Sequence, residues 1–238
     1  MIKAVTFDLW NTIISDKDYT DQRVKCLAET LLKLNISRSY DEIIEACIAS
    51  HEYVHEVWRD ENYRYSPADE RLNHILERLS AELTEDLRRR VLKEFEELVI
   101  ADPPPLIEGV RETLEFLSPR CKMGIICDTG VTPGRVLRKV LAGHQILGFF
   151  NVTVFSDEIG YNKPHKTMFE TALTNLEAKP SEAIHVGDLL HTDIAGAKAI
   201  GMKTVWFNRK GTANSEPHKP DYKIKTLPEL IIILNDIL

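Results

Sequence analysis

Three segments of the sequence place residues capable of chemistry directly after short apolar runs. The first run ends in Asp8, a later run is followed by Asp188 and Asp193, and Lys163 lies between them in the sequence. Each has an ordinary alternative role, because an acidic residue after a strand often caps a helix and a Lys-Pro pair often lies on a surface loop. Their order and their shared position at the ends of apolar runs instead favour one site that combines carboxylates with a lysine.

The apolar runs that carry these residues predict a parallel sheet. Short runs rich in β-branched and aromatic residues recur, and helical patterns separate them. The predicted strands are residues 3–9, 123–126, 152–155, 183–186 and 203–207. Strands that alternate with helices form βαβ units, so we expect an α/β fold with a doubly wound parallel sheet. Its functional site should lie at the carboxyl ends of the strands.

A long stretch between the first and second strands has helical periodicity and no strand pattern. Ser39 and Glu42 have the spacing of a capping box at a helix start. Three consecutive prolines at residues 103–105 cannot continue a helix, so they mark the return to the sheet-forming part of the chain. The predicted domains are an all-helical insertion at residues 14–105 and a core at residues 1–13 and 106–238.

Three sequence segments resemble motifs one, three and four of the haloacid dehalogenase (HAD) superfamily. They are Phe7-Asp8-Leu9-Trp10-Asn11-Thr12, Asn162-Lys163-Pro164 and Val186-Gly187-Asp188-Leu189-Leu190-His191-Thr192-Asp193. The resemblance covers essentially the whole core. It implies a hydrolase with a Rossmann-like sheet, and the helical insertion resembles the cap domain that many members carry between motifs one and two. The short stretch between motifs two and three leaves no room for the alternative, later cap.

The resemblance also implies a role for each motif residue. Asp8 would be a covalent nucleophile that forms an aspartyl-phosphate, which requires neutralisation of the phosphoryl charge. Lys163 would supply part of that neutralisation and keep Asp8 ionised. Mg²⁺, a cation that prefers oxygen ligands, would bind Asp8, Asp188 and the backbone carbonyl of Trp10. Asp193 would contact the ion through water or hold its other ligands in place.

Trp10 departs from the motif of the family's phosphatases. They usually carry a second aspartate there, which protonates the leaving group, whereas indole has no acid-base function near neutral pH. An aromatic residue at this position resembles the family's haloalkanoic acid dehalogenases, whose aspartate displaces halide without a metal. Asp188 with Asp193, however, resembles the metal-dependent form. A Mg²⁺-dependent phosphatase is therefore the main hypothesis; a metal-free dehalogenase and a catalytically weakened binding or regulatory protein are the alternatives.

The second strand ends in a segment that also departs from the family pattern. Cys127 stands where a phosphate-binding serine or threonine is expected. Either Thr129 supplies the hydroxyl through a shifted turn, or backbone N–H groups bind phosphate alone. Asp128 would replace the missing acid or serve as a cap or turn residue. Thr12 would hydrogen-bond Asp8 or cap the following segment. These four residues are the candidate substrate-binding group.

A second motif, His51-Glu52-Tyr53-Val54-His55, matches the HExxH pattern of zinc proteases. Both histidines lie beside the apolar stripe of a predicted helix, where partly buried structural histidines are common. His74 is the nearest downstream candidate for a third ligand, and it lies beyond the break at Pro67. We therefore favour a structural role for this pair.

Composition narrows the class of partner. The chain has 238 residues and a net charge of −7, which disfavours binding to a nucleic-acid backbone. Its longest apolar run is too short to span a bilayer, and no signal peptide is evident at the N-terminus. Its four cysteines form no CxxC pair, as is typical of a reducing compartment. We expect a cytoplasmic protein that acts on a small phosphorylated metabolite, without nucleic-acid or membrane partners; the sequence does not set its oligomeric state.

Overall fold

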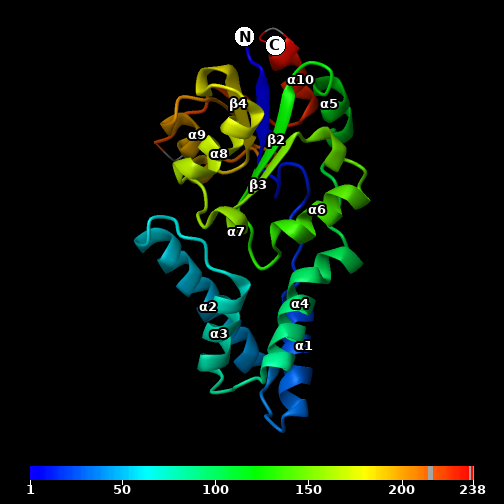
Figure 1. The fold of residues 1–238 in the computed structure, drawn as a ribbon, viewed down its shortest axis with the longest axis vertical. Coiled ribbons are helices and arrows are strands. Elements are labelled where there is room, and N and C mark those ends of the chain that lie inside the picture. The colour runs from blue at the N-terminus through cyan, green and yellow to red at the C-terminus, as the bar shows by residue number, and fades with distance from the viewer. Residues whose placement is uncertain (214–216, 236, 238) are drawn as a thin grey trace. The chain divides into compact units, whose positions relative to one another are not determined.

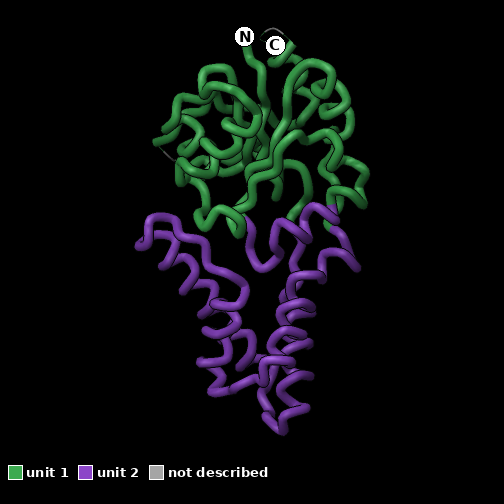
Figure 2. Tube along the Cα trace, viewed as in Figure 1, with its two compact units in different colours: residues 1–16, 104–128, 141–238 green, residues 17–103, 129–140 purple. Residues whose placement is uncertain are grey.

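The computed structural model describes residues 1–213, 217–235 and 237, and the chain forms two compact units (Figure 2). Unit 1 comprises Met1–Asp16, Pro104–Asp128 and Leu141–Leu238, and unit 2 comprises Lys17–Pro103 and Thr129–Val140. The second segment of unit 2 was expected in the core. It belongs to unit 2 because Val131 packs against the helical core there and Arg135 forms an ion pair with Glu96.

Unit 1 is built on a six-stranded sheet in which every neighbouring pair of strands is parallel. The strand order is β3-β2-β1-β4-β5-β6. The strands are β1 (Ala4–Phe7), β2 (Lys122–Cys127), β3 (Val152–Phe155), β4 (Ala183–Gly187), β5 (Lys203–Phe207) and β6 (Tyr222–Ile224). This is the doubly wound order, so the α/β prediction is confirmed. The strand order reverses at β1, and ligands bind such sheets at the carboxyl ends of strands near that point.

Helices cover both faces of this sheet, which explains why its central strands are continuous apolar runs. Every residue of β1 and β4 is buried. In Figure 1, α8 (Lys166–Leu176) and α9 (Ala195–Ala199) lie on one face, and α5 (Val110–Leu117) and α10 (Pro228–Asn235) lie on the other. Shorter elements connect the strands: α7 (Ser156–Ile159), η1 (Leu147–Phe149), η2 (Pro180–Glu182) and η3 (Leu190–Ile194). The helix α6 (Gly134–Gly143) contributes residues to both units.

Unit 2 consists mainly of four helices: α1 (Thr20–Lys33), α2 (Tyr40–Asp60), α3 (Ala68–Arg78) and α4 (Glu85–Ala101). Their apolar faces form one buried core that includes Leu27, Leu72 and Phe95. The predicted capping box is present at the start of α2, where Ser39 Oγ accepts from the backbone N–H of Glu42 and the Glu42 carboxylate accepts from that of Ser39. No helix among the described residues is long and apolar enough to cross a membrane.

The packing of α10 on α5 depends on one glycine. Gly109 caps α5 with a φ of 83°, a conformation that side chains rarely adopt, and a Cβ there would lie 2.6 Å from Cδ of Pro228. Pro228 is the first residue of α10, so the two helices approach closely because position 109 has no side chain.

We predict that Gly109→Ala lowers the free energy of unfolding by about 1–3 kcal/mol, through backbone strain and this steric overlap. Gly143→Ala is the matched control, because it lies at the end of α6 and a Cβ there meets nothing within 4 Å. Denaturant unfolding of both variants measures the difference. Equal unfolding midpoints would show that the approach of the two helices does not need the glycine.

Candidate active site

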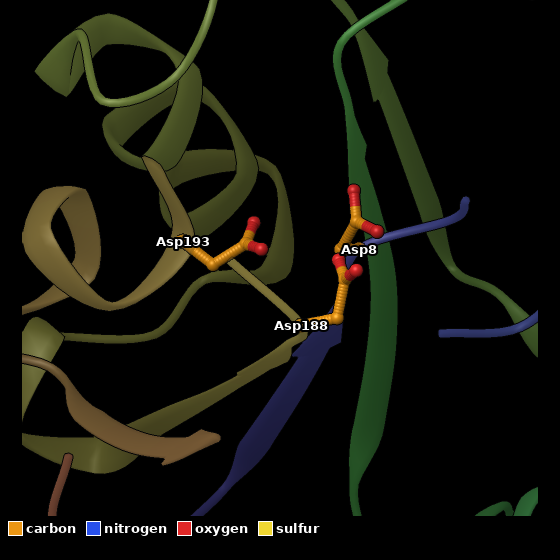
Figure 3. Close-up of side chains that lie close together, drawn as sticks. All are labelled: Asp8, Asp188 and Asp193. Carbon is orange, nitrogen blue, oxygen red and sulfur yellow. The ribbon is translucent and has the colours of Figure 1, made fainter. Parts of the chain in front are cut away.

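Three carboxylates meet at the carboxyl edge of β1 and β4. The two strands pair with Phe7 opposite Val186, so Asp8 and Asp188 emerge from neighbouring strands at the same edge. Asp193 follows in η3 and turns back toward them (Figure 3). One oxygen from each carboxylate lies within 4.8 Å of the others. These are three of the residues that the sequence proposed as metal ligands.

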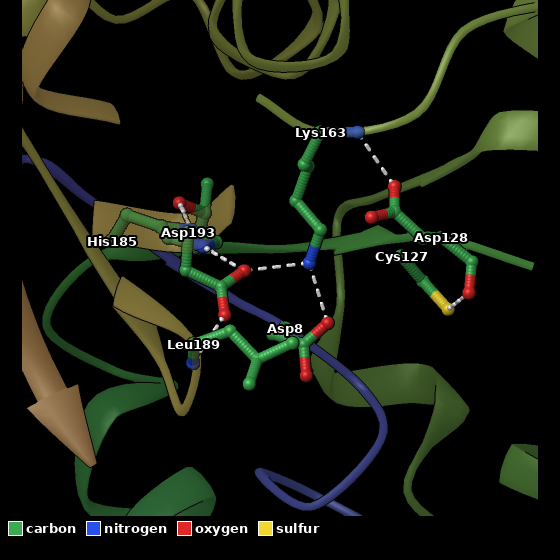
Figure 4. Close-up of polar contacts among 8 residues, drawn as sticks. Asp8, Cys127, Asp128, Lys163, His185, Leu189 and Asp193 are labelled. Atoms are coloured by element: carbon green, nitrogen blue, oxygen red, sulfur yellow. Dashed lines mark hydrogen bonds and ion pairs between the residues drawn. The ribbon is translucent and has the colours of Figure 1, made fainter. Parts of the chain in front are cut away.

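Lys163 joins two of these carboxylates. Its Nζ lies 2.5 Å from Asp8 Oδ1 and 2.7 Å from Asp193 Oδ1, and its side chain is only 2% exposed (Figure 4). Lys163 comes from the loop between α7 and α8, far from both partners in sequence. A buried ammonium with two carboxylate partners is fixed in position much more firmly than an exposed one.

The charges at this edge are strongly coupled. Burial raises the pKa of Asp8 well above its usual value, although the nearby Lys163 opposes this shift. Burial, with repulsion from Asp193, also raises the pKa of Asp188 to about 7. Burial acts against the ionised form of Asp193 too, but Lys163 and His185 together outweigh it and hold the pKa of that carboxyl well below its usual range. Three ionised carboxylates and one ammonium leave two unbalanced negative charges, which a divalent cation would offset.

A chain of hydrogen bonds fixes the orientation of Asp193. Its Oδ2 accepts from the backbone N–H of Leu189 at 3.0 Å, and its Oδ1 lies 3.3 Å from His185 Nε2. The other ring nitrogen of His185, Nδ1, lies 2.8 Å from Thr6 Oγ1. An ionised carboxylate only accepts, so Nε2 carries the proton and donates to Asp193, and the hydroxyl of Thr6 donates to Nδ1. Burial lowers the pKa of His185, consistent with a neutral ring.

Sequence reasoning assigned no role to His185 and did not consider Thr6. Both are fully buried polar residues inside otherwise apolar strands, and they lie opposite each other in the register of β1 and β4. Buried polar side chains in such strands need a hydrogen-bond partner. That pattern was the available signal, but the partner itself becomes visible only once the strands are paired.

Gly187 allows the close approach of Asp193 to the end of β4. A Cβ at this position would lie 2.3 Å from Cγ of Asp193, closer than any real contact. A glycine here would also permit a sharp turn of the backbone before Asp188. In the structure, the side chain of Asp193 excludes any larger residue at position 187, because it occupies the space that a Cβ would fill.

The residues that follow β2 lie close to Lys163. Asp128 Oδ1 accepts from the backbone N–H of Lys163 at 2.7 Å, so this carboxylate holds the lysine loop rather than capping the helix that follows. Burial raises the pKa of Asp128 to about 6. Cys127 is fully buried, which raises the pKa of its thiol, and Sγ donates to the carbonyl of Asp128 at 3.4 Å. A protonated thiol at this site is not an anionic nucleophile.

Three residues that the sequence proposed for the site, Thr12, Trp10 and Thr129, make fewer contacts that bear on their role. Thr12 is buried, and its hydroxyl has no hydrogen-bond partner among the described residues, so it neither bonds Asp8 nor caps the next segment. Trp10 is half-buried in a tight loop that is followed by Asn11 with a φ of 57°. Thr129 is buried and belongs to unit 2. Metal binding by the carbonyl of Trp10 and substrate binding by Thr129 therefore stay predictions.

The histidine pair of the HExxH motif does not assemble a zinc site in the part of the chain that the structure describes. The Nε2 atoms of His51 and His55 lie 3.0 Å apart and their rings meet edge to face. His74 stacks on Tyr53 instead of joining them. The three aspartates are the one described group of three or more residues with metal-binding geometry.

Comparisons with known proteins agree with this geometry. A model of the family described as haloacid dehalogenase-like hydrolase matches residues 2–201. The glyceraldehyde 3-phosphate phosphatase of Pyrococcus furiosus is 40% identical over 132 residues, 54% of this chain and 54% of that protein, so the match spans about half the length of the relative.

Two solved structures share the fold over nearly the full chain. The HAD-hydrolase YfnB from Bacillus subtilis, bound to magnesium, is 22% identical with a TM-score of 0.65 and covers 98% of this chain and 99% of its own. The 2-haloacid dehalogenase from Pseudomonas syringae pv. Tomato DC3000 is 23% identical with a TM-score of 0.76, and each chain is covered completely. Because the family model matches most of its length, this chain belongs to the haloacid dehalogenase-like hydrolases.

Proposed function

We propose that the protein is a Mg²⁺-dependent phosphatase that acts on a small phosphorylated metabolite through an aspartyl-phosphate at Asp8. The observation that carries this proposal is the group formed by Lys163 with Asp8 and Asp193, beside Asp188. The name of the Pyrococcus furiosus relative, glyceraldehyde 3-phosphate phosphatase, supports the same reaction class.

The donors at this edge suit Mg²⁺. They are carboxylate oxygens, the ligands that this hard cation prefers, and they carry excess negative charge. Asp8, Asp188 and the backbone carbonyl of Trp10 would hold the ion, with Asp193 acting through water. The magnesium bound in the Bacillus subtilis neighbour supports this choice of metal. The ion would neutralise part of the charge on the phosphoryl group.

The protein's own residues account for the nucleophilic step. A carboxylate oxygen of Asp8 forms a bond to phosphorus while the bond from phosphorus to the leaving-group oxygen breaks. Lys163 lies against Asp8 and stabilises the negative charge that the phosphoryl oxygens carry during transfer. Water then cleaves the acyl phosphate and regenerates Asp8. His185 and Leu189 keep Asp193, and through it Lys163, in position.

Trp10 restricts the leaving groups that this site can expel. It supplies no proton, so the leaving oxygen departs with nearly full negative charge unless another acid donates. Asp128 is a candidate acid, because its pKa is raised to about 6 and only one of its oxygens accepts from Lys163. Aryl phosphates, acyl phosphates and anhydrides depart readily without a proton, and they are the substrates that this site should favour.

A dehalogenase is the second candidate function, and Trp10 is the residue that favours it. Displacement of halide needs neither a proton nor a metal. The same Asp8 would then form an ester with a carbon atom of the substrate. Asp188 argues against this role, because its carboxylate repels the ionised form of Asp8. A dehalogenase that uses no metal has no cation to offset that repulsion. Dependence on metal separates the two functions.

Asp8→Asn should abolish turnover, because the amide is nearly isosteric but is a very poor nucleophile. Activity is measured on a panel of phosphorylated metabolites, including glyceraldehyde 3-phosphate, and on 2-haloacids. Asp16→Asn is the matched control, since Asp16 is exposed in the same unit. Retention of more than a few per cent of activity by Asp8→Asn would contradict a covalent role for this residue.

Removal of divalent metal with EDTA should abolish phosphatase activity, and added Mg²⁺ should restore it. Asp188→Ala should raise the Mg²⁺ concentration needed for half-maximal activity by about tenfold or more, because a ligand is lost. Mg²⁺ should also raise the thermal unfolding temperature of the wild type and leave that of Asp188→Ala nearly unchanged. Activity on 2-haloacids that is insensitive to EDTA would support the dehalogenase instead.

Trp10→Asp should reduce the dependence of the rate on leaving-group pKa. Alkyl phosphates should gain up to about 10² to 10⁴ in rate, whereas activated aryl phosphates should change little, because only poor leaving groups need the proton. A series of phosphate esters with graded leaving groups measures both slopes. If the rate depends only weakly on leaving-group pKa in both the wild type and Trp10→Asp, another acid already donates the proton. A stronger dependence in Asp128→Asn would identify that acid as Asp128.

A further inference from the structure

Unit 2 contains a cavity of its own, enclosed by its four long helices and by Val131. Its volume is about 580 Å³, within the range of pockets that hold small organic ligands. Most of its wall is apolar, with Ile44, Leu72 and Phe95 among the lining residues. Such a wall would take the hydrocarbon part of a ligand.

Two arginines interrupt the apolar wall. Arg23 comes from α1 and Arg71 from α3. The Nε of Arg23 is buried and has no hydrogen-bond partner among the described residues, and one Nη of Arg23 reaches the carbonyl of Phe95 only at 3.5 Å. Arg71 uses its Nε to donate to the carbonyl of Ser66 at 3.0 Å. Neither guanidinium forms an ion pair with any described residue, and the guanidinium carbon of Arg23 lies 5.8 Å from the centre of the Tyr19 ring.

The surrounding acidic groups do not balance these two charges. Glu70 is held by Arg64 through two hydrogen bonds, at 2.8 and 2.9 Å. Asp18 accepts from the backbone N–H of Thr20 at 2.8 Å, outside the cavity wall. Glu52 lines the cavity but is exposed to solvent. Burial lowers the pKa of Arg23; attraction from Asp18 opposes this shift without cancelling it, and repulsion from Arg71 adds to it.

We propose that this cavity binds a small organic anion with an apolar body, whose carboxylate or phosphate pairs with Arg23 and Arg71. A guanidinium pairs well with such anions, and its partly buried, unpaired state is unfavourable until one arrives. The apolar body of the ligand contacts the wall around Leu72 and Phe95. The anion is a separate small metabolite that binds within unit 2 alone. The site itself does not depend on the phosphatase reaction.

The stability of arginine variants toward unfolding distinguishes a binding role of Arg23 and Arg71 from a structural one. If the arginines served stability, their replacement would lower the free energy of unfolding. If they serve an anion, Arg23→Met relieves an unpaired charge in an apolar wall while keeping side-chain volume. The variant should then unfold at the same temperature as the wild type or at a higher one, and lose anion binding.

The probe is hexanoate, with hexanol as the uncharged analogue, titrated calorimetrically into the full chain without divalent metal. Metal-free conditions remove the cation that would otherwise attract an anion to Asp8, Asp188 and Asp193 in unit 1. Hexanoate should bind the wild type and bind Arg23→Met and Arg71→Met at least about tenfold more weakly. Lys25→Met, an exposed substitution on α1, is the control and should bind as the wild type does. Arg23→Gln and Arg71→Gln repeat the test where a methionine variant fails to fold.

Absence of hexanoate binding, equal binding of hexanol, or unchanged binding by the arginine variants would overturn the proposal. A lower unfolding temperature of Arg23→Met with unchanged binding would show a structural role instead.

Discussion

The buried ammonium of Lys163 connects the segments that make up the candidate active site of unit 1. Its Nζ bonds Asp8 at the end of β1 and Asp193 beyond β4. Its backbone N–H donates to Asp128 at the end of β2. Segments that follow three neighbouring strands therefore contact this one lysine. Loss of its charge would leave buried carboxylates without a partner, which is among the most destabilising changes in a protein interior.

The contacts around Lys163 explain features that otherwise look unrelated. Gly187 has no side chain because Asp193 must occupy that space to reach the lysine. His185 is polar in an otherwise apolar strand because it donates to Asp193, and Thr6 is polar because it donates to His185. A chain of hydrogen bonds thus runs from Lys163 through Asp193 and His185 to Thr6 inside the sheet, and it fixes the orientation of each side chain.

Each unit contains buried or half-buried charges of one sign without enough partners of the other. In unit 1 the excess is negative and belongs to three aspartates. In unit 2 it is positive and belongs to Arg23 and Arg71. Folding does not favour either arrangement, because unpaired buried charge lowers stability. Such sites persist where a ligand of opposite charge completes them, and this is why we propose a cation in one unit and an organic anion in the other.

The sequence alone determined the features that depend on neighbours along the chain. Strands buried on both faces are continuous apolar runs, so their positions, and those of Asp8 and Asp188 after them, were evident. The capping box of Ser39 and Glu42 spans one helical turn and was predicted for the same reason. The strand β6 was missed because it has only three residues, one of them Lys223.

Tertiary structure decided the features that depend on residues distant in sequence. The pairing of Thr6 with His185 follows from strand register, and the bond from Lys163 to Asp128 joins residues 35 positions apart. Arg23 and Arg71 lie on different helices, and neither disturbs the apolar periodicity of its own helix enough to be noticed. Periodicity reports which side of an element is buried, but it does not report which other element covers that side. The partners of buried polar groups are therefore fixed only when the elements pack.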